Sequence, residues 1–203
     1  MTATSEQGPP PRRLLFIQMS GPPGSGKSTM ASLLARSIGG VFLNHDITRT
    51  TVSRHVPDFN AAAQLAYDLC WSLAEEMLKQ GRSVIIDSAC YYKQIIEQGK
   101  ALAEKYGGEY WYVECHIDDI NVLEDRLRNR ASLSSQRTSV DSFPADASAN
   151  HHGEDPRALF ERAPCRPASH AIVVDATRSP EECRAIILEQ MGFSVAIQAV
   201  EQR

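Results

Sequence analysis

The sequence predicts an α/β fold, a three-layer sandwich in which a parallel sheet lies between two layers of helices. Short apolar runs alternate along the chain with longer segments of helical periodicity, which is the pattern of repeated strand and helix units. A glycine-rich segment at residues 21–29 joins the first apolar run to the first helical segment. The 203 residues, 42% of them hydrophobic, suffice for one domain with a full core.

Five strands are expected where the apolar runs are short. They cover residues 14–20, 40–45, 83–88, 110–117 and 171–176. Six helices are expected at residues 28–38, 59–79, 91–106, 119–130, 156–162 and 180–191. Their ends carry the usual signals, because Gly39 and Gly107 follow two of the helices, Asp58 precedes another, and the last begins at Pro180 and ends at Gly192.

The helix at residues 59–79 carries a regular apolar pattern. Leu65, Leu69, Leu73 and Met77 recur every four residues. Because residues four apart lie on the same side of a helix, we interpret these side chains as part of the core and not as a cofactor-binding face.

One domain is expected over residues 14–192, preceded by a disordered arm at residues 1–13 and followed by a tail at residues 193–203. Between residues 131 and 170 the apolar periodicity fades, and Ser, Asp, Ala, Asn and Pro dominate. So long an irregular segment in a compact domain is typical of a functional loop. We therefore predict a lid and loop at about residues 126–170, with a tolerated surface insertion as the alternative.

The glycine-rich segment is a complete P-loop, GPPGSGKST, whose glycines let successive backbone N–H groups form a nest for phosphate oxygens. Lys27 is expected to reach the β- and γ-phosphates during catalysis, and the Ser28 hydroxyl to bind Mg²⁺. The positions predicted to bind the nucleotide are Gly21, Pro23, Gly24, Ser25, Gly26, Lys27, Ser28 and Thr29. The alternative is a glycine-rich turn without a ligand.

Two acids follow expected strands at the carboxyl edge of the sheet. Asp87 ends the third strand and is predicted to hold magnesium, with capping of the next helix as the alternative. Asp46 ends the second strand and is predicted to be the general base that accepts a proton from an acceptor hydroxyl. Arg49 would neutralise an incoming anion or orient Asp46. Two alternatives stay open, that Asp46 caps a short helix through Arg54 and that His45 is the base.

The helix at residues 119–130 presents arginines beside the irregular segment. Arg126 and Arg130 are four residues apart and therefore share one face, which suits a lid that places guanidinium groups over phosphates. Arg137 is a candidate to join them. The alternative is a solvated helix with pairs such as Glu124 and Arg128.

The residues after the last strand complete the predicted nucleotide site. Asp175-Ala176-Thr177-Arg178 forms a loop before the last helix, and we expect this loop to pack on the adenine. Thr177 and Arg178 are therefore predicted to bind the nucleotide.

Composition excludes several classes of function. A net charge of −4 and the lack of basic clusters do not favour a surface for nucleic acid. The sequence contains no run of about twenty apolar residues and no apolar signal-peptide core, so a cytoplasmic location without membrane contact is expected. The five cysteines include no C-x-x-C pair, which makes a disulfide framework or a zinc site improbable.

With these residues in place, the chain resembles the small AAA-type P-loop kinases of the polynucleotide kinase, zeta toxin and chloramphenicol phosphotransferase group. The resemblance runs from about residue 14 to 191 and rests on GPPGSGKST, Asp46 with Arg49, Asp87, the paired Arg126 and Arg130, and DATRSP. It implies a P-loop NTPase fold with strand order 2-3-1-4-5, an acid at position 46 that deprotonates the acceptor, lid arginines that hold ATP, and an adenine-side loop at residues 175–178. The resemblance supports phosphoryl transfer as the reaction better than it identifies the acceptor substrate, because members of the group phosphorylate very different acceptors.

The sequence departs from two related classes. It lacks the Asn-Lys-x-Asp motif of GTPases, and Ser88-Ala89-Cys90 follows Asp87 where nucleoside monophosphate kinases carry D-G-[F/Y]-P-R. The preferred function is an ATP- and Mg²⁺-dependent phosphotransferase acting on a hydroxyl of a small molecule, as a monomer or homodimer. The acceptor pocket is expected between Asp46 and Arg49, the start of the helix at residues 59–79, and Tyr91-Tyr92. A 5′-hydroxyl polynucleotide kinase and a non-catalytic ATP-binding regulatory protein are the alternatives.

Overall fold

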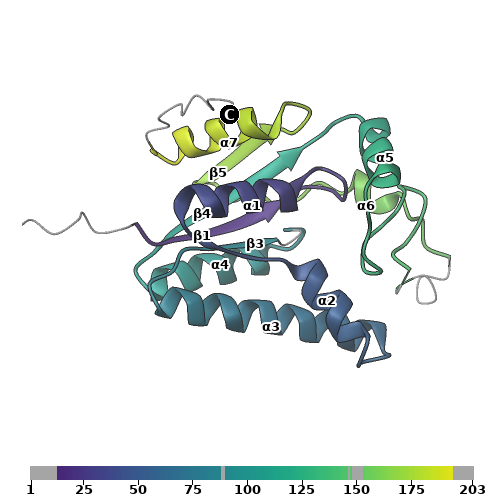
Figure 1. Cartoon of the computed structure of the whole chain (residues 1–203), viewed down its shortest axis with the longest axis horizontal. Helices are drawn as coiled ribbons and strands as arrows, with labels where there is room; N and C mark the ends of the chain where they lie inside the picture. The colour runs from purple at the N-terminus through teal and green to yellow at the C-terminus, as the bar shows by residue number, and fades with distance from the viewer. Residues whose placement is uncertain (1–12, 88–89, 146, 148–152, 194–203) are drawn as a thin grey trace, which may run out of the picture.

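In this computed structural model the chain is described for residues 13–87, 90–145, 147 and 153–193. A five-stranded sheet has the order β2-β3-β1-β4-β5, and each neighbouring pair is parallel (Figure 1). The strands are β1 Leu15–Ser20, β2 Val41–Leu43, β3 Val84–Asp87, β4 Glu109–His116 and β5 Ala171–Asp175. The helices are α1 Lys27–Ile38, α2 His45–Ser53, α3 Phe59–Lys79, α4 Lys93–Lys105, α5 Ile120–Asn129, α6 Ala158–Glu161 and α7 Pro180–Gln190. The predicted fold class and strand order are confirmed.

Helices cover both faces of the sheet, as expected for a parallel sheet (Figure 1). One core cluster joins α1 and α7 to one face and includes Ile17, Leu34 and Ile187. The other joins α3 and α4 to the opposite face and includes Phe16 and Trp71. Because every residue of β1 is buried, the loop that leaves its carboxyl end starts from the core of the sheet.

The helix ends follow the sequence signals closely. Gly39 adopts φ 61° after α1, and the Asp58 side chain accepts a hydrogen bond from Ala61 N at the start of α3. Ser179 and Glu182 form a reciprocal capping box at the start of α7. These local signals place the helix bounds within about two residues of those predicted.

The region after β2 differs from the prediction. β2 ends at Leu43, because the Asn44 side chain accepts hydrogen bonds from Asp46 N and Ile47 N and so caps helix α2. Asp46 therefore neither ends the strand nor caps the helix, but lies in the first turn of α2. In this position its side chain projects from the start of a helix, where the N–H dipoles favour a carboxylate.

The interpretation of the α3 leucines as core was wrong for three of them. Leu65, Leu69 and Leu73 are 43%, 41% and 46% exposed, whereas Met77 is partly buried. Each step of four residues turns about 40° past a full helical turn, so the series winds from solvent toward the core. The buried face of α3 is made by smaller residues and two large side chains: Ala62, Ala66, Cys70, Trp71, Ala74 and Leu78. The last four of them belong to the core cluster on this face of the sheet.

Candidate active site

A pocket of about 840 Å³ lies at the carboxyl edge of the sheet. On one side, the P-loop half, it is lined by residues of the P-loop, the start of α1, α5 and the loop after β5: Gly21, Gly24, Gly26, Lys27, Ser28, Thr29, Arg126, Ala176 and Arg178. On the other side, the α2 half, it is lined by residues of α2, α3, the segment before α4 and the segment after α5: His45, Asp46, Arg49, Tyr67, Tyr91, Tyr92, Gln136 and Pro144. Pro23, Ser25 and Arg130 also line it. A cavity of this size holds a nucleotide or a metabolite.

The P-loop backbone has the form that the sequence predicts. Gly21, Gly24 and Gly26 have φ values of 127°, 86° and 92°, which side chains other than glycine rarely adopt. A Cβ at Gly21 would lie 2.3 Å from the carbonyl oxygen of Cys115 on β4, whereas a Cβ at Gly26 would meet no atom within 4 Å. The first glycine is thus required by packing against the sheet, and the third faces open space.

Lys27 and Ser28 begin α1 beside this loop. The Lys27 ammonium donates to the carbonyl oxygen of Pro22 at 3.0 Å, and therefore lies along the P-loop. The Ser28 hydroxyl donates to Asp87 Oδ2 at 2.6 Å. A hydroxyl and a carboxylate in contact are the oxygen ligands that Mg²⁺ prefers, so the residues present fit a magnesium ion. No group of three or more His, Cys, Asp or Glu suited to a metal occurs among the residues that the structure describes.

Asp46 lies in the α2 half with one oxygen already engaged. Gln136 donates its side-chain N–H to Asp46 Oδ2 at 2.7 Å. His45, the alternative base, contacts the Tyr67 ring edge-on and has a buried Nε2 with no hydrogen-bond partner among the described residues. Burial lowers the pKa of His45, with Asp46 acting in the opposite direction, so its imidazole is neutral at pH 7.

Arg126 in α5 and Arg130 directly after it both line the pocket. Arg126 donates to the carbonyl oxygen of Ala176 at 2.8 Å, and Arg130 donates to that of Arg137 at 3.1 Å. Arg128 points to solvent and pairs with Glu124.

Arg130 and Arg137 are cations in a site with few counter-charges. Burial lowers the pKa of both guanidinium groups, while the charges of Asp46 and Asp87 act in the opposite direction on Arg130. Arg130 Nε is buried without a hydrogen-bond partner among the described residues. Arg130 therefore lies within electrostatic reach of both acids and has a free donor for an anion.

The loop after β5 is placed beside Arg126, but only part of it reaches the pocket. Asp175 accepts hydrogen bonds from Thr177 N and Thr177 Oγ1, at 3.0 and 2.6 Å. Ala176 and Arg178 line the pocket, whereas Thr177 does not. The Thr177 side chain is thus bonded to Asp175 within the loop and does not reach the pocket, unlike the other residues predicted to bind the nucleotide.

Residues 16–149 match the model of a protein family described as AAA domain. The chain belongs to this AAA-domain family. Comparison of the sequence with curated proteins gave no match. No helix within the described part of the chain combines the length and the apolar character needed to cross a bilayer.

Solved structures of small P-loop kinases share the fold of this AAA domain. An unliganded sugar kinase from Janibacter sp. HTCC2649 aligns with a TM-score of 0.60 at 17% identity, over 90% of this chain and 96% of the other. A gluconokinase from Sinorhizobium meliloti 1021 gives 0.58 at 18%, over 89% and 94%. The APS kinase of Mycobacterium tuberculosis, in complex with AMPPNP and APS, gives 0.61 at 17%, over 90% and 99%. At these identities the likeness establishes the fold.

The structure of the AAA domain also places at or near the pocket two residues that the sequence did not indicate, Tyr67 and Arg162. Tyr67 of α3 lines the α2 half beside Tyr91 and Tyr92. The Arg162 guanidinium lies over the rings of Tyr91 and Tyr92, 5.1 and 4.6 Å from their centroids, and donates to the carbonyl oxygen of Tyr91 at 3.1 Å. Neither Tyr67 nor Arg162 stands in a recognisable motif, so no local pattern could have found them.

Proposed function

We propose that the protein is an ATP- and Mg²⁺-dependent phosphotransferase that moves the γ-phosphoryl group to a hydroxyl of a small molecule. The observation that carries this proposal is that Lys27 and Asp46 line one pocket, with Arg130 under the electrostatic influence of both Asp46 and Asp87. A phosphate cradle, a metal acid, a base and a covering arginine are the parts that phosphoryl transfer requires. The kinase structures that share the fold, one with the ATP analogue AMPPNP, support the same reading.

In the P-loop half, the nucleotide would lie with its phosphates over the N–H groups of residues 24–29 and the start of α1. Arg126 and the loop at residues 176–178 would flank the adenine, and Arg130 would approach the γ-phosphate. Ser28 and Asp87 would hold the magnesium ion, which when bound neutralises phosphate charge.

In the α2 half, an acceptor would place its hydroxyl between Asp46 and the γ-phosphate. Asp46 takes the hydroxyl proton, the acceptor oxygen forms a bond to the γ-phosphorus, and the bond from that phosphorus to the bridging oxygen breaks, which releases ADP. Lys27 and Arg130 stabilise the charge on the transferred group. We assign the base to Asp46 and not to His45, because the His45 Nε2 is buried and its ring lies edge-on against Tyr67.

The walls of the α2 half support a small acceptor with a planar or sugar ring. Tyr67, Tyr91 and Tyr92 provide aromatic faces, and Arg49 stacks on Phe59 with 4.4 Å from the guanidinium carbon to the ring centroid. Such a pocket suits a single metabolite better than a nucleic-acid strand, which would need an extended basic groove.

The test is a screen of hydroxylated metabolites and 5′-hydroxyl oligonucleotides with labelled ATP and Mg²⁺, followed by Asp46→Asn. The variant should transfer about 10³-fold more slowly with nearly unchanged ATP affinity, because the base acts on the acceptor and not on the nucleotide. Asp125→Asn, at an exposed position of α5, is the matched control and should transfer normally. Unchanged turnover in Asp46→Asn would refute the role of Asp46 as general base. Transfer only to oligonucleotides would refute a small molecule as the acceptor. Tight ATP binding without any transfer would refute phosphotransferase activity.

A further inference from the structure

Three consecutive residues of the segment between α5 and α6 connect the two halves of the pocket. Ser135 Oγ donates to the carbonyl oxygen of Asp46 at 3.1 Å, and Gln136 donates to Asp46 Oδ2 at 2.7 Å. The next residue, Arg137, accepts through its carbonyl oxygen the hydrogen bond from Arg130. A single short stretch of the chain thus contacts both Asp46 of α2 and Arg130 at the end of α5.

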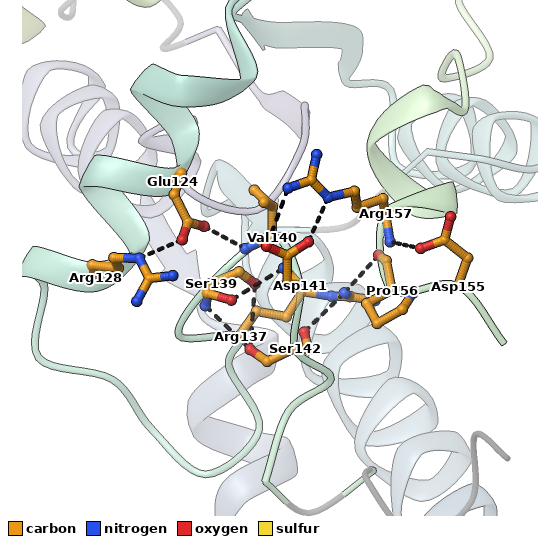
Figure 2. A network of polar contacts seen from close by, with 10 residues as sticks. All are labelled: Glu124, Arg128, Arg137, Ser139, Val140, Asp141, Ser142, Asp155, Pro156 and Arg157. Carbon is orange, nitrogen blue, oxygen red and sulfur yellow. Dashed lines mark hydrogen bonds and ion pairs between the residues drawn. The ribbon is translucent and has the colours of Figure 1, made fainter. Parts of the chain in front are cut away.

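This stretch is held from behind by the rest of the segment (Figure 2). The Arg137 side chain is 8% exposed and donates to the carbonyl oxygens of Ser142 and Pro156, each at 2.9 Å. Its guanidinium carbon lies 4.9 Å from the ring centroid of Phe143. Because a buried guanidinium with these partners has one favourable position, it fixes the backbone at residues 135–137.

Further contacts hold the same segment to its neighbours. Glu124 of α5 accepts from the backbone N–H of Val140 at 2.6 Å, and Arg157 pairs with Asp141 through both carboxylate oxygens (Figure 2). The Thr50 and Ser135 hydroxyls lie 2.8 Å apart in a buried contact. Residues 135–142 of the segment are therefore a folded wall of the pocket, attached both to α5 and to α2.

The contact of Gln136 has a specific chemical consequence. A carboxylate has two oxygens, and a general base must present one of them to the hydroxyl it deprotonates. The Gln136 amide occupies Oδ2 and so leaves Oδ1 for the acceptor. As a neutral donor, it orients the carboxylate without adding a second cation beside the base.

We propose that Gln136 is a positioning residue for Asp46, brought to it by the docked segment between α5 and α6. This inference rests on the proposed function, in which Asp46 is the base. It assigns the irregular segment a role on the acceptor side: the segment sets the direction of the base and, through Arg137, the place of Arg130. Transfer and docking of the segment are then linked, because an undocked segment leaves Asp46 free to rotate.

The kinetic test uses Gln136→Ala with the acceptor from the screen, or with water as acceptor through ATP hydrolysis. We expect kcat to fall about tenfold or more, with little change in the KM for ATP, because only the reacting geometry is disturbed. Gln64→Ala is the matched control, since Gln64 donates to Asp68 Oδ1 at 2.9 Å in an exposed contact of the same type. Equal kcat in Gln136→Ala and the wild type would overturn the proposal.

A pH profile of Gln136→Glu separates positioning from a structural role. At pH 8 two carboxylates face one another, and kcat should lie below that of Gln136→Ala. As the pH falls below 8, protonation of the new side chain lets it donate to Asp46, so the ratio of kcat in Gln136→Glu to kcat in Gln136→Ala should rise. A constant ratio between the two variants across this range would also overturn the proposal.

Crystal structures with bound AMPPNP give a readout that does not depend on activity. The Asp46 carboxylate should keep its direction in the wild type and in Gln64→Ala, and rotate in Gln136→Ala. An unrotated carboxylate would overturn the positioning role even if the wild type transferred no phosphoryl group. That absence of transfer in the wild type would refute the proposed function by itself, so the two failures are distinguishable.

Discussion

In the P-loop half of the pocket, most groups that face the cavity come from one short run of chain, whereas in the α2 half they come from α2, α3, the segment before α4 and the segment after α5. The first half is made largely of backbone whose shape is fixed by glycines at positive φ. The second is held by side-chain contacts between residues far apart in sequence, such as Gln136 and Asp46, which are 90 residues apart. One half is therefore encoded locally, and the other depends on the whole fold.

The largest effect is expected from a substitution that disturbs only the P-loop half of the pocket. Lys27→Ala removes the cation beside the P-loop, and both ATP affinity and transfer should fall, transfer by about 10³-fold or more. Isothermal titration with AMPPNP and a labelled-ATP assay measure the two quantities. The thermal midpoint should hardly change, because the ammonium contacts only one loop carbonyl. A variant that bound AMPPNP like the wild type would contradict the placement of the phosphates.

A smaller effect is expected where the two halves meet. Arg130→Ala removes the guanidinium that is close to both Asp46 and Asp87, and kcat should fall about 10²-fold. Arg128→Ala, two residues earlier on the exposed face of α5, is the control and should leave kcat within about twofold. Equal losses in the two variants would show that the charge of α5, and not the position of Arg130, matters.

The α2 half can be weakened through its support without touching the pocket. Arg166 donates to both carboxylate oxygens of the buried Glu114, at 2.8 and 2.7 Å, and so anchors the segment that carries Arg162. Arg166→Ala should lower the free energy of unfolding by about 2 kcal/mol, a figure reduced for the partial exposure of the arginine. Denaturant titration at pH 7 measures it, and a change within error would contradict the anchoring role.

The same pair predicts how the deficit depends on pH. Burial acts to raise the pKa of Glu114, but hydrogen bonds from Arg166 and Tyr112 outweigh it and hold the pKa below the ordinary value. The native pair therefore stabilises the protein above the ordinary carboxyl pKa, and this contribution is lost as pH falls through the lowered one. In Arg166→Ala the burial of Glu114 is opposed only in part, by the Tyr112 hydrogen bond and the charge of His116, so the deficit relative to the wild type should shrink between pH 7 and pH 4. A deficit that grew on acidification would contradict this sign.

The smallest expected effect concerns the α3 leucines. Leu69→Ser, at a 41% exposed position, should change the free energy of unfolding by no more than about 0.5 kcal/mol. Leu78→Ala, at a position that is 1% exposed on the same helix, should cost about 2 to 5 kcal/mol. Urea titrations compare them, and a large loss in Leu69→Ser would mean that this face is covered in solution.

The sequence predicts well what depends on neighbouring residues. The strand order inferred from the resemblance is found, and the helices begin where Asp58 and Pro180 predict them to. The P-loop was recognisable because its glycine spacing encodes the backbone shape directly. The roles assigned to Asp46, Asp87 and Arg130 remain predictions, although the structure brings all three to one pocket.

What the sequence did not predict depends on long-range packing. The exposure of Leu65 and Leu73 follows from which side of α3 faces the sheet, and periodicity alone does not specify that side. Gln136 lies in an irregular segment without a motif, and its significance appears only when the segment folds onto α2. The predictions for Ser88-Ala89, for the arm at residues 1–12 and for the tail at residues 194–203 concern residues outside the described part of the chain.

The two outer glycines of the P-loop carry different evolutionary constraints. A methyl group on Gly21 would press into the main chain of β4, so any descendant that kept this sheet would keep that glycine, with or without a nucleotide to bind. A Cβ at Gly26 would meet no atom of the described residues, so within the protein only the positive φ restrains this glycine, and the phosphates of the proposed nucleotide would add a second restraint. Asparagine and aspartate tolerate positive φ better than other residues with a side chain. In descendants that no longer bind a nucleotide, we therefore expect them to replace glycine at position 26 before any substitution occurs at position 21.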